Sequence, residues 1–327
     1  MSNKPKANIL LTGVVLLLSL SISFGLGEIV VRLKNSSMKN YDIEMWRYAK
    51  DLKVRSNIEV LGHEHIPSKC ATLQSVEICT DEFGLRRQTK NSPQVSKRRI
   101  LFLGSSVTLG WGVPESETLT SRLQAKFSKE DGVEILNAGI GNYNAIRYVT
   151  RFKSRLTELQ PTDIVVHYFV RDAETLDSGG GNFLLRNSEL AVMSWIAASR
   201  YLWQSSDQTL EQHYKGVYQP DAPGFIAMRN ALHELATYAR DRGIRIYLAM
   251  TPDVHDLIDY KFGFIHDKVR AIADDEGYKY VDLYPPMKDL TPEDLWAMPG
   301  DPHPNSLGHK VMADAIYPIL AISDTKK

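Results

Sequence analysis

Two short segments, far apart in the sequence, carry side chains that could perform acyl transfer. The first, Gly104-Ser105-Ser106-Val107, follows the apolar run Ile100–Leu103, so a serine hydroxyl is expected at the carboxyl end of a buried strand. The second, Asp301-Pro302-His303-Pro304-Asn305, holds a carboxylate and an imidazole in one loop that its prolines stiffen. A serine nucleophile, a histidine base and an aspartate that orients the histidine are the minimal set for catalysis through a serine ester. The pair of segments therefore predicts Ser106, His303 and Asp301 in these three roles.

A catalytic serine also needs hydrogen-bond donors for the oxyanion that develops on the substrate carbonyl. The backbone N–H of Ser106 is one candidate. The stretch Asn137–Asn144 is another, because glycines and asparagines after a strand suit exposed N–H groups. The same composition equally suits a plain turn in which an asparagine caps the next helix.

Strand and helix patterns alternate from Arg98 onward. Apolar runs predict buried strands at Ile100–Leu103, Val133–Leu136, Ile164–Val170, Ile244–Met250 and Tyr278–Leu283. Apolar residues at three-and-four spacing predict helices at Thr118–Phe127, Ile146–Leu159, Ala227–Arg240, Ile265–Asp274 and Leu307–Ile322. This alternation favours an α/β fold with a parallel sheet covered on both faces. Sites in such folds form outside the carboxyl ends of the strands, where the candidate segments could converge.

The amino terminus holds a segment that could cross a membrane. No charge occurs between Lys6 and Glu28, and a helix over Ala7–Gly27 would be about 30 Å long, enough to span the hydrocarbon core. We favour an uncleaved signal anchor over a cleaved signal peptide, because no small-residue cleavage site is evident, and over a buried core helix. Lysines and arginines flank the span on both sides and do not decide its orientation. The short tail before the span favours export of the large domain to the periplasmic or extracytoplasmic side.

The composition is that of an ordinary packed protein and excludes some functions. Of the 327 residues, 43% are hydrophobic, and 39 lysines and arginines balance 39 aspartates and glutamates, so nothing favours nucleic acid as a partner. Cys70 and Cys79 suggest a disulfide-closed loop in an exported domain, against the alternative of two unrelated buried thiols. Two cysteines without a nearby histidine pair argue against zinc. No Gly-x-Gly-x-x-Gly segment supports a nucleotide-binding protein, and we expect no metal and no organic cofactor.

The chain is predicted to have three parts. Residues 1–27 form a tail and transmembrane anchor, residues 28–97 a membrane-proximal segment that packs onto the main domain, and residues 98–323 the catalytic domain. Within the last part, residues 172–222 form an insertion that could be a lid or a substrate wall. Its three glycines at 179–181 indicate a flexible connection. Among the other histidines, His309 is expected to be structural, while His213, His255 and His266 receive no role.

Three blocks of the sequence resemble the SGNH/GDSL hydrolase family. Arg99–Val113 resembles its first block, Asn137–Asn144 its second and Asp301–His309 its last, in the same order over residues 98–323. The resemblance implies a three-layer α/β/α sandwich with a flavodoxin-like parallel sheet. It also implies a serine hydrolase in which His303 activates Ser106 and Asp301 orients His303, with an oxyanion donor at Gly141 or Asn142.

Two positions depart from the family pattern. The family's Gly-Asp-Ser is Gly-Ser-Ser here, which leaves Ser106 in place. In the third block, the asparagine that usually precedes an aspartate is Arg171, in Phe169-Val170-Arg171-Asp172. Arg171 could replace the asparagine as an oxyanion donor, pair with Asp172 or Glu174 as part of the structure, or bind an anionic substrate.

These observations predict a membrane-tethered serine esterase or acyl (acetyl) transferase. Its expected substrate is an ester-bearing small molecule or polysaccharide of the cell envelope, first of all an O-acylated carbohydrate, with lipid esters and thioesters as alternatives. The competing hypothesis, which Arg171 supports, is a catalytically silent SGNH-fold protein that binds glycans or scaffolds an envelope assembly. The enzyme hypothesis requires Ser106 Oγ and the His303 ring to lie within hydrogen-bonding reach.

Overall fold

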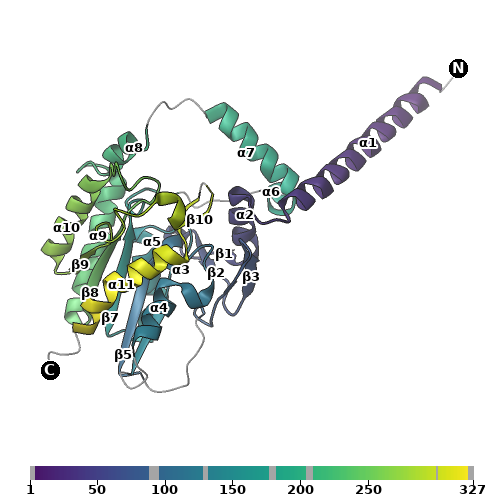
Figure 1. Ribbon diagram of the computed structural model, residues 1–327. Helices are drawn as coiled ribbons and strands as arrows, with labels where there is room; N and C mark the ends of the chain where they lie inside the picture. The colour runs from purple at the N-terminus through teal and green to yellow at the C-terminus, as the bar shows by residue number, and fades with distance from the viewer. Residues whose placement is uncertain are drawn as a thin grey trace. The chain divides into compact units, whose positions relative to one another are not determined.

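A five-stranded parallel sheet organises the part of the chain that contains the candidate site (Figure 1). The computed structural model describes residues 4–87, 96–127, 132–176, 182–203, 209–299 and 301–322. In spatial order the strands are β6 (Val133–Asn137), β5 (Arg98–Gly104), β7 (Asp163–Phe169), β8 (Arg245–Thr251) and β9 (Lys279–Asp282). Their apolar side chains are almost fully buried, as expected for strands covered on both faces. All five predicted strands are present, and their order is that of flavodoxin-like sheets.

Two groups of helices cover the sheet. On one face α4 (Leu119–Lys126) packs against α11 (Ser306–Ile322). On the other, α9 (Pro223–Asp241) packs against both α5 (Ala145–Arg151) and α10 (Gly263–Glu276). Right-handed crossovers between parallel strands place the groups on opposite faces. The predicted three-layer α/β/α class is therefore confirmed. The helix predicted over Ile146–Leu159 continues beyond α5 as a π-helical turn, η4 (Phe152–Leu156), and a 3-10 turn, η5 (Thr157–Leu159).

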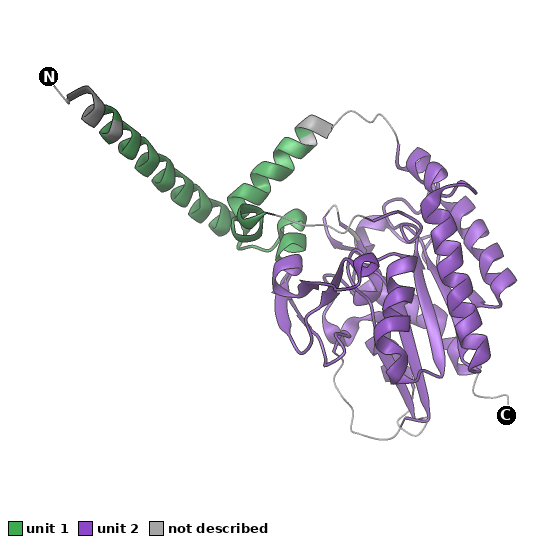
Figure 2. Ribbon diagram, turned by 180° about the vertical axis from the view of Figure 1, so that it is seen from behind, with its two compact units in different colours: residues 1–47, 180–207 green, residues 48–179, 208–327 purple. Residues whose placement is uncertain are grey.

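The chain divides into two compact units (Figure 2). The smaller comprises residues 1–47 and 180–207, and the larger comprises residues 48–179 and 208–327, including the sheet. The region predicted as a membrane-proximal segment, residues 28–97, is thus divided at residue 48. Its described residues after that point, 48–87, lie in the same unit as the sheet, and we refer to them as segment 48–87.

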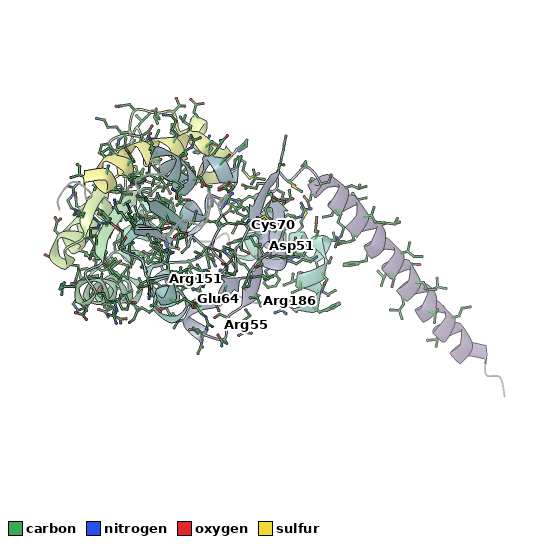
Figure 3. All side chains as sticks on the ribbon, turned by 90° about the horizontal axis from the view of Figure 1, so that it is seen from below. Asp51, Arg55, Glu64, Cys70, Arg151 and Arg186 are labelled. Atoms are coloured by element: carbon green, nitrogen blue, oxygen red, sulfur yellow. A yellow bond between two sulfur atoms is a disulfide. The ribbon has the colours of Figure 1, made fainter. Side chains whose placement is uncertain are left out.

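Segment 48–87 folds into two small antiparallel sheets. It includes the end of α2 (Tyr41–Asp51), and β1 (Lys53–Arg55) pairs with β2 (His63–His65) after the 3-10 turn η1 (Glu59–Leu61). The second sheet is a hairpin of β3 (Cys70–Leu73) and β4 (Val76–Cys79). Gln74 and Ser75 form its two-residue turn with φ of 49° and 63°, as tight hairpin turns require. The Cys70–Cys79 disulfide joins the other end of the hairpin, so the predicted disulfide is present (Figure 3).

The smaller unit contains the apolar amino-terminal helix. Helix α1 (Lys4–Asn35) is longer than the anchor predicted over Ala7–Gly27, and its residues Leu11–Asn35 are long and apolar enough to cross a membrane. A signal sequence near the amino terminus would meet the same criterion. The unit also holds α6 (Phe183–Asn187) and α7 (Glu189–Trp203), which come from the predicted insertion 172–222. The three glycines of that insertion lie outside the described residues, and its remaining helix, α8 (Leu210–Val217), belongs to the larger unit.

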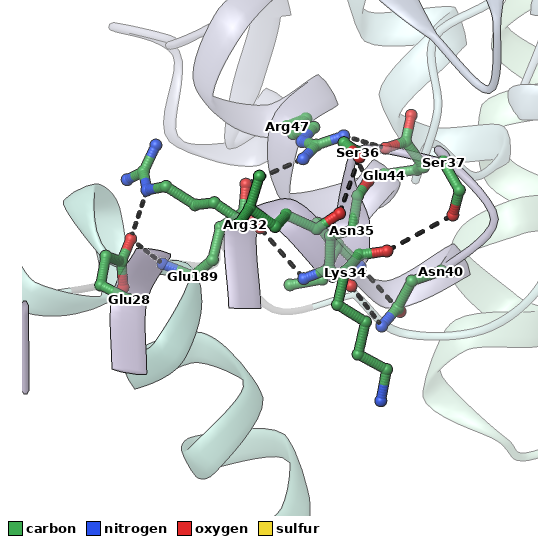
Figure 4. A network of polar contacts seen from close by, with 12 residues as sticks. Glu28, Arg32, Lys34, Asn35, Ser36, Ser37, Asn40, Glu44, Arg47 and Glu189 are labelled. Carbon is green, nitrogen blue, oxygen red and sulfur yellow. Dashed lines mark hydrogen bonds and ion pairs between the residues drawn. The ribbon is translucent and has the colours of Figure 1, made fainter. Parts of the chain in front are cut away.

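A polar network joins α1 to α7 within the smaller unit (Figure 4). The Glu28 carboxylate accepts hydrogen bonds from the Ser188 hydroxyl and from the backbone N–H groups of Glu189 and Leu190. It thereby caps the amino end of α7, where a negative charge is favourable. The Glu189 carboxylate in turn accepts from Asn35 and from the Arg47 guanidinium. The amino end of α7 is therefore hydrogen-bonded to the carboxyl-terminal part of α1.

Candidate active site

Ser106 stands where β5 ends. It is the first residue of the short helix α3 (Ser106–Leu109) and is partly exposed. The preceding strand residue, Gly104, has no room for a side chain. A Cβ there would lie 2.0 Å from Thr108 Oγ1 and 2.7 Å from the carbonyl oxygen of His167. A glycine at this position thus lets α3 turn tightly against the sheet and present the Ser106 hydroxyl at its carboxyl edge.

Asp301 and His303 lie on a short strand, not in the loop that we expected. Strand β11 (Asp301–Pro304) pairs antiparallel with β10 (Trp296–Met298) through an irregular register. A two-stranded ribbon of this kind tolerates prolines, because an edge strand needs few of its backbone N–H groups. Asn305 follows the strand, and its side-chain oxygen accepts the N–H groups of Leu307 and Gly308. It therefore caps the amino end of α11.

The three predicted catalytic side chains meet in one hydrogen-bonded chain. His303 Nδ1 donates to Asp301 Oδ1 at 2.5 Å, and His303 Nε2 lies 2.7 Å from Ser106 Oγ. Since the Nδ1 proton faces a carboxylate, Nε2 is the accepting nitrogen and the Ser106 hydroxyl donates to it. The predicted hydrogen-bonding distance between Ser106 and His303 is confirmed. Such a geometry can move the serine proton to the imidazole as the oxygen attacks a carbonyl.

Asp301 is buried but remains the charged member of this chain. Burial alone raises the pKa of Asp301, but the hydrogen bonds that its carboxylate accepts from His303 and Gln74 offset burial and lower the pKa below 3.8. Gln74 Nε2 donates to Asp301 Oδ2 at 3.1 Å from the turn of the disulfide-closed hairpin. Gly112 of the first block makes room for this side chain, because a Cβ there would lie 2.3 Å from Gln74 Oε1. The sequence analysis did not identify Gln74, because no pattern in the sequence around it indicates a contact with Asp301, 227 residues away.

The two candidate oxyanion donors of the second block differ in their environment. The N–H of Gly141 donates to the Tyr48 hydroxyl at 2.9 Å and is therefore already engaged. Asn142 is exposed, with φ of 63°, and among the described residues its N–H makes no hydrogen bond. The loop lies against the end of β5, since the Ile140 N–H donates to the carbonyl of Gly104. Of the two positions, Asn142 alone leaves its N–H available to a ligand.

Arg171 pairs with a neighbouring carboxylate. Its guanidinium forms an ion pair with Glu174 at 3.1 Å, and 56% of its side chain is exposed. Asp172 is turned inward, where its carboxylate accepts the Phe169 N–H and burial raises its pKa. Of the three roles considered for Arg171, the structural one has a direct contact in its support, the ion pair with Glu174.

Segment 48–87 contacts the first-block and second-block loops as well as Asp301. The buried Arg86 guanidinium donates to the carbonyls of Leu109, Gly110 and Val113. Arg151 of α5 donates to the carbonyls of both Gly84 and Ala138, the latter in the second block. The loops that carry the candidate site are therefore fixed from outside the sheet.

A second Asp–His pair lies beside β10. Asp253 Oδ1 accepts both the backbone N–H and Nδ1 of His255, at 2.9 and 2.6 Å, repeating the arrangement of Asp301 and His303. The His255 ring lies 6.4 Å from that of Trp296. The hydrogen bond to Asp253, with the charges of Asp253 and Asp301, raises the pKa of His255 despite its partial burial. We had given His255 no role, although the repeated Asp-x-His spacing could have drawn attention to it.

The remaining predictions about single residues have simple outcomes. His309 is buried, and its Nδ1 accepts the Leu119 N–H, as expected of a structural histidine. Among the described residues, Cys70, Glu77 and Cys79 are grouped closely enough to suggest a metal site. Because both cysteines are in the disulfide, they have no thiolate to offer a metal.

Comparisons with known proteins identify a family and several similar solved structures. A protein-family model described as the GDSL-like lipase/acylhydrolase family matches residues 102–311. No curated protein matches the chain significantly. Similar solved structures include LAE5, an alpha/beta hydrolase enzyme from the metagenome of Lake Arreo, Spain (16% identity, TM-score 0.46, covering 70% of this chain and 97% of that one). A mutant of Axe2, an acetyl-xylooligosaccharide esterase from Geobacillus Stearmophilus, has 16% identity and a TM-score of 0.46, covering 68% of this chain and 93% of that one. The psychrotrophic esterase EstA from Pseudoalteromonas sp. has 15% identity and a TM-score of 0.43, covering 69% and 98%.

Proposed function

Because the chain belongs to the GDSL-like lipase/acylhydrolase family, we propose that it is a serine esterase or O-acyltransferase with Ser106, His303 and Asp301 as its catalytic residues. The observation that carries this proposal is the 2.7 Å contact between Ser106 Oγ and His303 Nε2, with the buried Asp301 carboxylate on the opposite side of the ring. A family match alone would not require these groups to meet.

The geometry supports a two-step reaction. Ser106 Oγ attacks the ester carbonyl while its proton passes to His303 Nε2, and Asp301 stabilises the imidazolium that forms. The tetrahedral adduct collapses to an acyl-serine, and His303 returns the proton to the leaving alcohol. Water, or the hydroxyl of an acceptor, then gives its proton to His303 and attacks the acyl-serine. As this second adduct collapses, the bond to Ser106 Oγ breaks and His303 returns the proton to the serine oxygen.

The oxyanion of each tetrahedral adduct needs donors at the same edge of the sheet. We assign this role to the backbone N–H groups of Ser106 and Asn142. Gly141, the other second-block candidate, already donates to Tyr48. Arg171 is left out of the assignment, because its guanidinium is paired with Glu174.

The tether suggests where the substrate is found. With α1 as an uncleaved anchor and the larger unit exported, the enzyme would act on esters of the cell envelope, first of all an O-acylated carbohydrate. The Cys70–Cys79 disulfide supports an oxidising, extracytoplasmic compartment. In this scheme residues 1–27 anchor the protein and residues 98–323 carry the hydrolase fold, with residues 28–97 between them.

A fluorophosphonate probe tests the catalytic assignment. Incubated with the full-length protein in detergent, the probe should modify Ser106, and Ser106→Ala should remove both the labelling and the turnover of a simple acetyl ester. A well-folded wild-type sample that shows neither would favour the second candidate, a catalytically silent protein that binds envelope glycans. The arginine in place of the family's asparagine is the observation that favours that candidate.

A further inference from the structure

Side chains of segment 48–87 form hydrogen bonds to the peptide group between Gly141 and Asn142. The carbonyl oxygen of Gly141 accepts hydrogen bonds from Lys53 Nζ at 2.8 Å and from His63 Nε2 at 2.9 Å. On the preceding peptide group, the Gly141 N–H donates to the Tyr48 hydroxyl. Gly141 has no room for a side chain, since a Cβ would lie 2.5 Å from Cε1 of Tyr48. Three side chains outside the family match therefore set the position of this loop.

These three side chains are themselves held in place. The Tyr48 hydroxyl donates to His65 Nε2 at 2.6 Å, and His65 Nδ1 donates to the carbonyl of Gly84 at 2.9 Å. Lys53 Nζ lies 4.0 Å from the centre of the Tyr48 ring, within the range of a cation–π contact. The ammonium group thus has two fixed partners, the ring and the Gly141 carbonyl.

A cation on a carbonyl oxygen strengthens the N–H of the same peptide group as a hydrogen-bond donor. The oxygen draws electron density along the amide, and hydrogen bonds in such chains polarise one another. Here the amide that shares the Gly141 carbonyl carries the N–H of Asn142. Building on the proposed esterase function, we propose that Lys53 is a positioning residue that holds and polarises this peptide group, so that Asn142 donates more strongly to the oxyanion.

This role of Lys53 is consistent with the third block, in which Arg171 stands where the family has an asparagine. Losing one oxyanion donor typically lowers turnover by a factor of roughly 100 to 1,000. The family's asparagine is absent here, and the arginine in its place pairs with Glu174. A strengthened donor at Asn142 compensates for part of that loss.

Lys53 is also the group in this cluster whose charge changes near neutral pH. Burial, together with the nearby charge of Arg147 on α5, lowers the pKa of Lys53 from 10.5 to about 7. Burial and the charge of Lys53 lower the pKa of His63 to about 3, and burial raises the pKa of Tyr48. His65 on β2 is likewise held neutral by burial, which lowers its pKa. Turnover should therefore fall as Lys53 loses its proton above neutral pH.

The test compares three variants of the full-length protein in detergent. Lys53→Met removes the charge, Lys53→Arg keeps it with a higher pKa, and Lys153→Met serves as a control that removes an exposed lysine paired with Glu234. We expect Lys53→Met to lower kcat for a simple acetyl ester about tenfold with little change in KM, and to abolish the alkaline decline near pH 7. Lys53→Arg should recover much of the loss and move the alkaline decline to higher pH. Lys153→Met should match wild type.

Thermal unfolding separates this role from a merely structural one. Because the pKa of Lys53 is lower in the folded protein, the unfolded chain binds the extra proton between pH 7 and 10.5, so stability rises with pH across that window. The buried ammonium therefore costs stability at neutral pH, and Lys53→Met should not lower Tm.

Two results would overturn the inference. One is a Lys53→Met enzyme with wild-type kcat and pH profile. The other is an equal loss in Lys53→Arg and Lys53→Met at every pH, which would mean that Lys53 acts only through packing. Labelling of wild-type Ser106 by the fluorophosphonate distinguishes these from failure of the proposed function, since an unlabelled, inactive wild type removes both proposals together.

Discussion

Two buried aspartates at opposite edges of the sheet have similar surroundings and different consequences. Asp163 begins β7, and its carboxylate accepts from Arg98, Arg245 and Thr162, two of which also lie at strand starts. Asp301 lies at the other edge, where its partners are His303 and Gln74. In both cases charged or polar donors outweigh burial and lower the pKa of the carboxyl group.

The difference lies in where each chain of hydrogen bonds ends. The hydrogen bonds of Asp163 lead to the guanidinium groups of Arg98 and Arg245, which stay charged at any ordinary pH. Because these groups cannot exchange a proton, the network stabilises the fold and has no part in proton transfer. From Asp301 the chain of hydrogen bonds runs through an imidazole, which can gain a proton, to a partly exposed hydroxyl. A buried carboxylate therefore points to catalysis only when its partner can exchange a proton with a group that a substrate can reach.

The largest expected effect on turnover is that of a substitution at Asp301. Asp301→Asn should lower kcat about a thousandfold or more, because the amide neither holds the Nδ1 tautomer of His303 nor stabilises its imidazolium. Steady-state hydrolysis of an acetyl ester measures the loss, with thermal unfolding as the control for folding. A loss of less than tenfold in a folded variant would contradict the role given to Asp301.

Asp163→Asn should show the opposite pattern. Removing one partner of a buried ion pair leaves the arginines uncompensated, which typically costs about 3–5 kcal/mol of stability. Denaturant unfolding of wild type and variant measures this loss, while kcat per folded molecule should be unchanged. Since the folded pKa of Asp163 lies below 3.8, its contribution is complete above that pH and is lost as the pH falls through the folded value. A variant with wild-type stability at neutral pH would show that the network is dispensable.

Gln74→Leu should have an intermediate effect on turnover. It removes the hydrogen bond to Asp301 Oδ2, and bonds to charged groups are worth about 1.5–3 kcal/mol, so we expect kcat to fall about tenfold. The pKa of Asp301 should rise, moving the acid decline of activity to higher pH. Gln219→Leu, at an exposed glutamine, is the matched control. An unchanged pH profile in Gln74→Leu would mean that the hairpin only covers Asp301.

The sequence pointed to the sheet and to the hydrogen-bonded group of Ser106, His303 and Asp301 because both leave local signals. Runs such as Ile100–Leu103 can be read without any partner, and Asp301 lies only two residues from His303. Lys53 and Gln74 leave no such signal, since their partners Gly141 and Asp301 lie far along the chain and segment 48–87 has weak periodicity. Tertiary contacts also settle choices between residues for which the amino-acid composition gives no preference.

The choice between Gly141 and Asn142 shows this dependence on tertiary contacts. Both residues suit an exposed loop, and the sequence of the second block gives no reason to prefer one of them as the oxyanion donor. The Tyr48 hydroxyl of segment 48–87 distinguishes the two residues as candidate oxyanion donors, because it accepts the N–H of Gly141. The same holds for Asp301–Pro304, whose strand conformation depends on pairing with β10.

The smallest expected effect concerns Arg171. Because its guanidinium is paired with Glu174 and largely exposed, Arg171→Ala should change kcat less than about threefold, whereas the loss of a true oxyanion donor would lower it about a hundredfold or more. Kinetics with a neutral acetyl ester decide between these values. A selective rise in KM for an anionic ester would instead favour substrate binding by Arg171. A near-neutral result would agree with compensation for the missing asparagine from the second block, where Lys53 donates to the Gly141 carbonyl.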